Sequence, residues 1–258
     1  METPDIIRQK GRCRMGQAAM TNDSARVKIH DRDTRGLTNA GWLKSRHSFS
    51  FGRFYDPARM GAGPLRVMNE DVVAPGAGFG THPHDNMEII SCVLKGALEH
   101  KDSMGTGSVI KTGDIQKMSA GSGVSHSEFN HSPDEPVHFY QIWIVPDQEN
   151  IAPSYEQISL DPAEFSEGFV LVGGGREGSD KTVSIQQDAK FLIAMPKEGT
   201  ELTYSFKPSR KGFLQVVRGQ VTLEGETLKE GDGAELSDAG EICITALTDA
   251  EIFLFEFA

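Results

Sequence analysis

The sequence predicts an all-β protein built from two similar halves, each an antiparallel sandwich or barrel. Short β-prone runs recur at a spacing of about 8–12 residues and are bounded by Gly, Pro, Asn or Asp. Sustained helical periodicity is nearly absent between residues 60 and 146. The last seventy residues then return to the layout of this first region, which indicates an internal repeat.

Four β-prone runs make up the first half. They are rich in β-branched and aromatic residues, which favour strands. The insertions KTGD and SAGSG are typical of turns. The runs are PLRVMNEDVVA (64–74), MEIISCVLKGALEHKD (87–102), SVIKTGDIQKMSA (108–120) and VHFYQIWIVP (137–146).

The pattern loosens after residue 146, and we expect a connector over 147–180. The triple glycine at 173–175 could be taken for a phosphate-binding loop. It lacks the Gly-Lys-Ser/Thr ending of such a loop, however, and no strand–helix unit follows it. We therefore predict a plain turn between strands.

The repeat divides the chain into domains. The stretch 212–236 reads strand, glycine, strand, Gly-Asp turn and strand, as the run from 87 to 120 does. We predict an N-terminal barrel over 31–146 and a C-terminal barrel over 181–258. The last histidine of the chain is His138, so the second half cannot bind a metal through imidazole. Residues 1–30 are expected to be a disordered leader, within which Met15 or Met20 could be the true start.

Composition excludes several classes of function. The formal net charge is −11 and no basic stripe occurs, so direct binding of nucleic acid is not expected. No apolar run approaches the ~20 residues that span a membrane, and the leader lacks the apolar core of a signal peptide. The three cysteines, Cys13, Cys92 and Cys243, form no CxxC pair. We expect reduced cysteines and a cytoplasmic protein.

Two short histidine motifs carry the chemistry. Side chains at i and i+2 of a strand lie on one face. His82 and His84 in GTHPHDN have this spacing, and so do His126 and Glu128 in GVSHSEFN. Neutral imidazole and carboxylate together bind late first-row metals such as Fe, Mn, Ni, Co, Cu or Zn. Such a set leaves coordination positions open, as catalysis requires.

Other polar residues near these motifs allow alternatives. The position of Glu88 permits either a ligand in place of Glu128 or a supporting role. His100 and His138 are expected to be structural or surface residues, although His100 could lie near the pocket. His47 and His131 are expected in loops, and Asn130 at a strand end.

GTHPHDNMEIISCVLKGALEHKDSMG, followed by GDIQKMSAGSGVSHSEFN, resembles the two cupin motifs of the pirin family. It is most similar to the bacterial pirin-like quercetin 2,3-dioxygenases. The likeness also covers GWLKSRHSFSFGRFYDPARMG, PVHFYQIWIVP and, more faintly, the C-terminal half. Gly76, His82, His84 and Glu88 match the general first motif, whereas Ser119 departs from the proline of the second.

The resemblance implies a bicupin fold, two face-to-face antiparallel β-barrels of the jelly-roll or double-stranded β-helix type. It implies metal in the N-terminal barrel only, with His82, His84, His126 and Glu128 as its ligands. In this family the glutamate after the third histidine takes the place of the first-motif glutamate. Glu88 is then a supporting residue. We favour Fe(II), while Ni, Mn, Co, Cu or Zn would also fit.

The same resemblance implies a quercetin 2,3-dioxygenase-like oxidoreductase. A flavonol such as quercetin would lose its 3-hydroxyl proton to Glu128 as general base and react with dioxygen, with ring opening and release of carbon monoxide. The alternative is a pirin-type regulator or redox sensor that acts through a protein partner without turnover. A monomer is slightly preferred. Candidates for an apolar substrate pocket are Phe49, Phe51, Phe54, Phe139 and Trp143.

Overall fold

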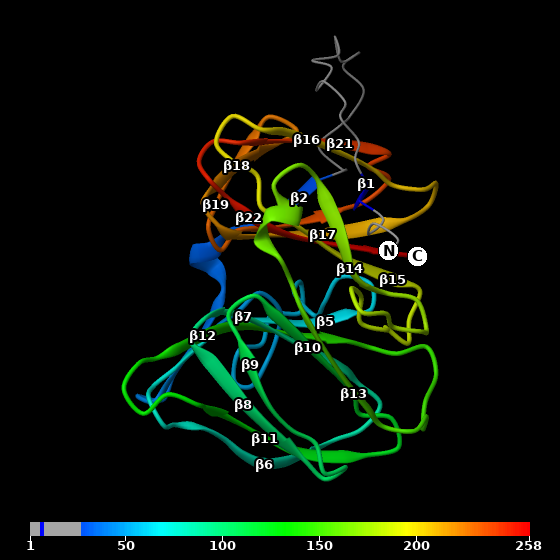
Figure 1. The fold of residues 1–258 in the computed structure, drawn as a ribbon. Coiled ribbons are helices and arrows are strands. Elements are labelled where there is room, and N and C mark those ends of the chain that lie inside the picture. The colour runs from blue at the N-terminus through cyan, green and yellow to red at the C-terminus, as the bar shows by residue number, and fades with distance from the viewer. Residues whose placement is uncertain (1–5, 8–26) are drawn as a thin grey trace. The chain divides into compact units, whose positions relative to one another are not determined.

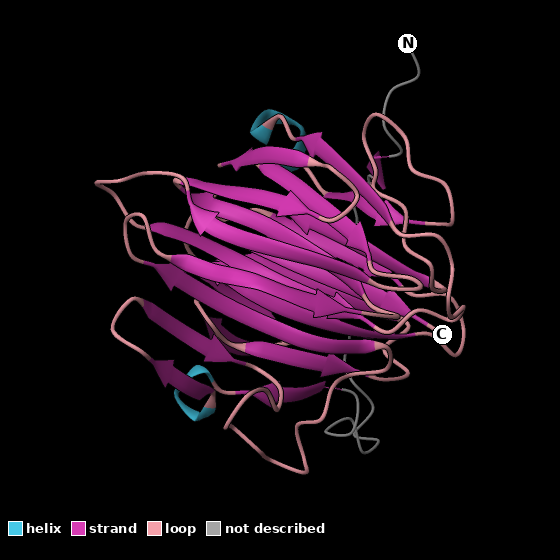
Figure 2. Ribbon diagram, turned by 90° about the horizontal axis from the view of Figure 1, so that it is seen from below, coloured by secondary structure: helices cyan, strands magenta, loops and turns pink. Residues whose placement is uncertain are grey.

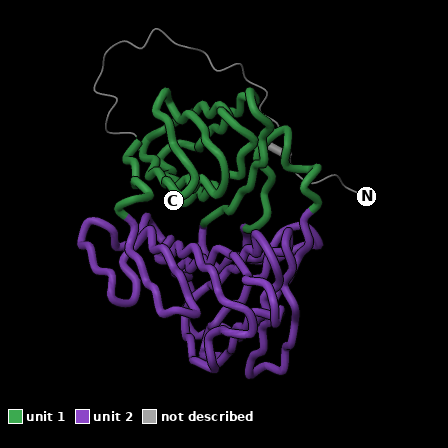
Figure 3. The backbone as a smooth tube through the Cα atoms, turned by 90° about the vertical axis from the view of Figure 1, so that its left-hand side faces the viewer, with its two compact units in different colours: residues 1–34, 161–173, 189–258 green, residues 35–160, 174–188 purple. Residues whose placement is uncertain are grey.

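The computed structural model describes residues 6–7 and 27–258, and its regular structure is almost entirely β (Figures 1 and 2). The chain folds into two compact units (Figure 3). Unit 1 holds residues 1–34, 161–173 and 189–258, and unit 2 holds 35–160 and 174–188. None of the helices in the described part of the chain could span a lipid bilayer. The all-β prediction and the division into two cupin-like units are confirmed.

Unit 2 consists of a seven-stranded and a four-stranded antiparallel sheet. In the larger sheet the strand order is β13-β10-β7-β12-β5-β4-β3, and in the smaller one it is β6-β11-β8-β9. The strands are β3 Gly36–Asn39, β4 Leu43–His47, β5 Leu65–Val73, β6 Gly78–His84, β7 Glu88–Lys95, β8 Ala97–Asp102, β9 Gly107–Lys111, β10 Asp114–Ser119, β11 Val124–Asn130, β12 Val137–Ile144 and β13 Ser154–Ser159. All four predicted runs of the first half are strands.

Unit 1 repeats this plan. Its larger sheet has the order β1-β14-β15-β22-β17-β20-β2, and its smaller sheet β16-β21-β18-β19. Two short 3-10 helices, η2 Arg32–Thr34 and η3 Pro162–Phe165, occur in its connections. The strands are β1 Ile6–Ile7, β2 Val27–His30, β14 Phe169–Gly174, β15 Ala189–Ala194, β16 Glu201–Ser205, β17 Lys211–Arg218, β18 Gln220–Leu223, β19 Glu226–Lys229, β20 Gly233–Leu236, β21 Glu241–Ala246 and β22 Glu251–Phe257.

The internal repeat is visible in strand pairing. In unit 2, β7 pairs with β10 and β8 with β9, and in unit 1, β17 pairs with β20 and β18 with β19. Glycine occupies the matching turns because the backbone there has positive φ. The values are 83° at Gly96 and 78° at Gly219, then 88° at Gly113 and 90° at Gly231. The matching glycines in the sequence therefore indicate that the backbone follows the same course through these turns in both units.

The observed boundaries differ from the predicted domains. Within the expected connector 147–180, β13 pairs along its whole length with β10, and β14 belongs to the larger sheet of unit 1. The side chains of β13 are mostly polar and half-buried because it is an edge strand with one neighbour, so its sequence lacks a strong apolar pattern. Residues 174–188 return to unit 2.

Part of the predicted leader is also structured. Val27–His30 form β2, which pairs with β20, and Ile6–Ile7 pair with β14. The expectation of disorder is therefore incorrect for these residues. The rest of the leader, 1–5 and 8–26, lies outside the described residues. The triple glycine ends β14 and enters a turn that no helix follows in the described chain, as expected.

The cysteines depart from the expectation that all are reduced. Cys92 on β7 is buried and free, as expected. Cys243 on β21, however, is disulfide-bonded. Cys13 lies outside the described residues. Sequence spacing could not reveal this bond because pairing depends on which segments the fold brings together.

Candidate metal centre

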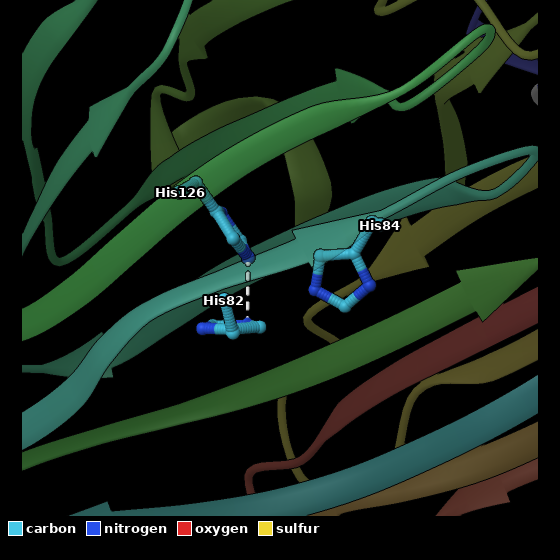
Figure 4. A group of neighbouring side chains, drawn as sticks. All are labelled: His82, His84 and His126. Carbon is cyan, nitrogen blue, oxygen red and sulfur yellow. Dashed lines mark hydrogen bonds between the residues drawn. The ribbon is translucent and has the colours of Figure 1, made fainter.

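Two neighbouring strands of unit 2 bring three histidines together. β6 and β11 pair antiparallel, with His126 opposite His82 and Val124 opposite His84. The i, i+2 spacing on β6 places the imidazoles of His82 and His84 on one face. Figure 4 shows the three rings grouped together, and the ring centroids are 4.5–4.9 Å apart. The nitrogen cluster predicted from the two motifs is therefore present.

The spacing of the nitrogen atoms suits a metal ion. Nε2 of His126 lies 3.0 Å from Nε2 of His82. Two nitrogens that each lie about 2.1 Å from one ion, at a right angle, would be about 3.0 Å apart. Possible ligand atoms of His82, His84 and His126 all lie within 4.8 Å of one another. The three imidazoles thus fit a late first-row ion.

The imidazoles of His84 and His126 are neutral near neutral pH, the state that metal binding needs. Burial, together with the nearby His82, His84 and His100, lowers the pKa of His126 to about 2. Burial and His82 lower the pKa of His84 to about 4. His82 Nδ1 donates to the carbonyl oxygen of Gly80 at 2.8 Å, because that oxygen can only accept. In the neutral ring this leaves the Nε2 lone pair of His82 directed at His126.

Glu128 lies two residues beyond His126 and is almost completely buried, with 1% of its surface exposed. A register irregularity separates the two residues, so Glu128 faces Phe79 on β6. Ser91 donates to Oε1 at 3.3 Å and Gln141 donates to Oε2 at 2.7 Å. Burial raises the pKa of Glu128. Burial of a carboxylate is costly unless it is paired, so a cation bound nearby would stabilise the ionised form of Glu128.

The four expected ligands do not form one set of mutually close atoms. The three histidines form one group, and Glu128 groups with His126 and His100 within 4.8 Å. His126 therefore links the two groups. The structure shows a His/Glu cluster suited to a metal ion, and the assignment of individual ligands stays a prediction.

Glu88 is engaged elsewhere, which fits a supporting role. Its Oε2 accepts from the hydroxyl of Ser119 at 3.0 Å and from the backbone N–H of Gln186 at 3.2 Å. The ammonium of the buried Lys117 lies 3.4 Å away. These partners hold the carboxylate within a separate buried network.

Of two buried histidines, His47 is placed differently from the expectation, whereas His100 is a structural residue near the site, as the sequence allowed. His100 is completely buried, its Nε2 lies 3.1 Å from Oδ2 of Asp102, and its ring lies 5.3 Å from that of His126. His47, expected in a loop, is a buried residue of β4 whose Nδ1 lies 2.8 Å from Oδ1 of Asn69. Polar side chains surround His47 along β4, so the sequence there lacked the apolar pattern that would have indicated a strand.

The remaining polar candidates are placed as expected. Asn130 closes a strand end, where its Nδ2 donates to the carbonyl oxygens of Val73, Ala74 and Glu135. His131 is exposed and pairs with Glu99. His138 pairs with Glu70 at 3.1 Å and is half-buried.

The five aromatic pocket candidates separate into two groups. Phe49 and Phe139 are buried core residues, and Phe54 packs over the backbone of Gly36. Trp143 and Phe51 lie next to the histidine cluster. The Trp143 ring lies 5.0 Å from that of His84, edge to face, and the Phe51 ring lies 5.5 Å from that of Trp143. These two side chains are partly exposed.

Unit 1 has a different interior. A large cluster of buried apolar side chains fills it, including Leu192, Leu202, Leu214, Ile244 and Leu254. Because these side chains pack closely, they leave little room for inward-facing polar ligands. The repeat therefore reproduces the fold without the histidine cluster.

Comparison with known proteins agrees with the fold. The family model described as Pirin matches residues 29–144, and the one described as Quercetinase C-terminal cupin domain matches 173–257. A quercetin 2,3-dioxygenase of Escherichia coli strain K12 is 41% identical over 89% of this chain and 98% of its own length. A pirin-like protein of Caulobacter vibrioides is also 41% identical, over 88% of this chain and 97% of its own.

Solved structures agree. The crystal structure of YhhW from Escherichia coli has a TM-score of 0.86 at 40% identity and covers 90% of this chain and 97% of its own. A second structure, of bacterial pirin YhhW in complex with nickel(II), has a TM-score of 0.85 at 39% identity and covers 90% and 98%. These similarities extend over both units. The chain belongs to the pirin family of cupin proteins.

Proposed function

We propose that this protein is a metal-dependent dioxygenase that opens the heterocyclic ring of a flavonol such as quercetin and releases carbon monoxide. The observation that carries the proposal is the cluster of three imidazoles beside a buried glutamate. The names of relatives at about 40% identity over most of the chain support the same reaction class.

His82, His84, His126 and Glu128 are the residues that we propose to hold the ion. A divalent transition metal bound there would act as a Lewis acid toward an enol oxygen and provide a site for dioxygen chemistry. Fe(II) remains our favoured ion because it suits oxygen chemistry, and nickel(II) is the ion in the complex of the similar bacterial pirin.

Glu128 is proposed as the general base. Ser91 and Gln141 each donate to one of its oxygens, so the carboxylate is held in a defined orientation. Burial raises its pKa, which makes the ionised group a stronger base than an exposed glutamate. It would accept the 3-hydroxyl proton of the flavonol. The resulting flavonolate is more electron-rich than the neutral flavonol and would react with dioxygen more readily.

The partly exposed aromatic residues beside His84 form the proposed substrate wall. Trp143 and Phe51 meet edge to face, with an interplanar angle of 89°. A flat polyphenol would pack against such a surface and exclude water from the reacting ring. Phe49 and Phe139 are less suitable because they are buried in the core.

Turnover of quercetin tests this proposal. Metal-free protein is reconstituted separately with Fe(II) and Ni(II) and incubated with quercetin in air, while flavonol absorbance and carbon monoxide are followed. We expect both signals from wild type and their loss in Glu128→Gln. His82→Ala should lose bound metal. Equal metal content in His82→Ala and wild type would contradict the ligand assignment.

The same assay addresses the alternative function. A metal-replete wild-type protein that gives no turnover, with Glu128→Gln behaving identically, would favour a regulator or redox sensor that acts through a protein partner. The cytoplasmic location and the monomeric state also stay predictions. Size measurement in solution tests the latter.

A further inference from the structure

A third strand contributes to the metal centre from the side opposite β6. Strand β8 is the other neighbour of β11 (Figure 1). In the register of this pair, His100 is opposite Glu128 and Asp102 is opposite His126. Side chains at directly opposite positions of an antiparallel pair lie on the same face of the sheet. The register thus places a second histidine–carboxylate pair directly beside the residues proposed as ligands.

His100 is held in one orientation. Its Nε2 lies 3.1 Å from Oδ2 of Asp102, and both side chains are completely shielded from solvent. The other oxygen of Asp102 accepts from the backbone N–H groups of Met104 at 2.9 Å and Thr106 at 3.0 Å. The turn that follows β8 therefore fixes the carboxylate, and the carboxylate fixes the imidazole.

Packing restrains the ring from another direction. The ring of Tyr155, from β13, lies 5.0 Å from that of His100 at an interplanar angle of 35°. Contact with an aromatic face on one side and a hydrogen bond at Nε2 leave His100 little rotational freedom. A side chain that only fills the core needs no such hydrogen bond to fix its orientation, so the restraint on His100 favours a functional role.

The restrained imidazole adjoins Glu128 and His126. A possible ligand atom from each of His100, His126 and Glu128 lies within 4.8 Å of the other two, and all three residues are buried. Nδ1 of His100 and Nδ1 of His126 have no hydrogen-bond partner among the described residues. Ser91 and Gln141 hold Glu128 from the larger sheet. His100 closes the remaining side from the smaller sheet.

We propose that His100, fixed by Asp102, is a positioning residue of the metal centre that holds Glu128 and His126 where they bind the ion. The proposal rests on the metal centre of the proposed function. Polar groups behind metal ligands set ligand orientation, and their replacement lowers metal affinity by about 10–100-fold. A role in core packing alone would predict a change in stability without a change in affinity or metal geometry.

The test compares metal binding in matched variants. His100→Phe keeps an aromatic ring and removes both nitrogens, whereas His100→Gln keeps a polar side chain. Asp102→Asn removes the charge that fixes the ring. Lys101→Gln is the control, since Lys101 lies between them on β8 with 69% of its side chain exposed. The measurements are the Co(II) dissociation constant by chelator competition, the Co(II) d–d absorption spectrum, and circular dichroism of the metal-free proteins.

We expect Co(II) affinity to fall about 10–100-fold in His100→Phe and Asp102→Asn, with altered d–d bands. His100→Gln should recover part of the affinity, and Lys101→Gln should match wild type. Wild-type affinity and spectrum in a folded His100→Phe would overturn the proposal. If that variant does not fold, the same result in Asp102→Asn would overturn it.

The readout separates this proposal from the proposed reaction. If wild type binds Co(II) and the variants weaken it, while metal-loaded wild type never consumes quercetin, the positioning role holds and the dioxygenase proposal fails. If wild type turns over quercetin and the variants bind Co(II) normally, only the positioning role fails. A wild-type protein without metal affinity would refute both.

Discussion

Replacement of Asp71 by asparagine tests how much the ionisation of a buried carboxyl destabilises unit 2. Asp71 lies on β5 opposite Ser45 and Phe139, and only 2% of its surface is exposed. Its Oδ1 has no hydrogen-bond partner within the described part of the chain. Burial, reinforced by the charges of Glu128 and Glu70, raises the pKa of Asp71 to about 7. The folded protein therefore keeps this carboxyl protonated at pH values where the unfolded chain has ionised it.

The shift sets the size and direction of the effect. A rise from 3.8 to about 7 corresponds to about 4 kcal/mol, at about 1.36 kcal/mol for each pKa unit. Because the folded pKa is raised, this stability is fully present below the unfolded value of 3.8 and is lost as the pH rises to about 7. Asparagine cannot ionise. Asp71→Asn should therefore gain about 4 kcal/mol relative to wild type between about pH 4 and pH 8.

Urea unfolding of metal-free protein at several pH values measures this difference. The free energies of unfolding of wild type and Asp71→Asn are compared at each pH, so a constant packing effect of the amide cancels. Asp134→Asn, at an exposed position, is the surface control. A difference between Asp71→Asn and wild type that stays constant from about pH 4 to pH 8 would refute the reasoning.

Three further outcomes are expected. Lys117→Met should destabilise unit 2 by about 3–5 kcal/mol in urea unfolding, because the ammonium is completely buried against two carboxylates; exposed Lys101→Met should change stability by less than about 1 kcal/mol, and similar losses in the two variants would argue against the buried network. Gly219→Ala should lower the melting temperature more than Gly225→Ala. Both glycines have positive φ, but only at Gly219 would a Cβ clash with the carbonyl oxygen of Asp249, so equal losses would exclude the clash. Removal of metal by a chelator should lower stability by about 3 kcal/mol when the free ion had been near 100 times its Kd, with recovery on adding Ni(II) or Fe(II); an unchanged melting curve would speak against metal binding to the folded state.

Much of the fold was predictable because its signals are local. Strand residues and turn glycines can be recognised within a few positions of the chain, and positive φ at Gly96 and Gly113 follows from short-range geometry. The repeat at Gly219 and Gly231 then indicated a second unit of the same plan. Edge strands escaped prediction. β2 and β13 each have a single neighbour, so their side chains carry no clear buried pattern.

The histidine pairs were also recognisable locally. The i, i+2 spacing of His82 and His84 places both imidazoles on one face whatever the rest of the chain does. The approach of His126 to His82, by contrast, depends on the pairing of β6 with β11 across 44 residues. The two motifs taken together anticipated that approach and the resemblance to a known family supported it, whereas the periodicity of either strand alone could not reveal it.

Amino-acid order therefore determined the strands, the turns and the two histidine motifs, because each depends on spacing along a short piece of backbone. Tertiary structure alone decided the environment of those motifs. It buried Glu128 between Ser91 and Gln141, directed Glu88 into a separate network, and placed His100 beside His126 and Glu128. The burial of a side chain and its distance from other charged groups depend on which strands lie side by side. These two factors control proton affinity and metal binding.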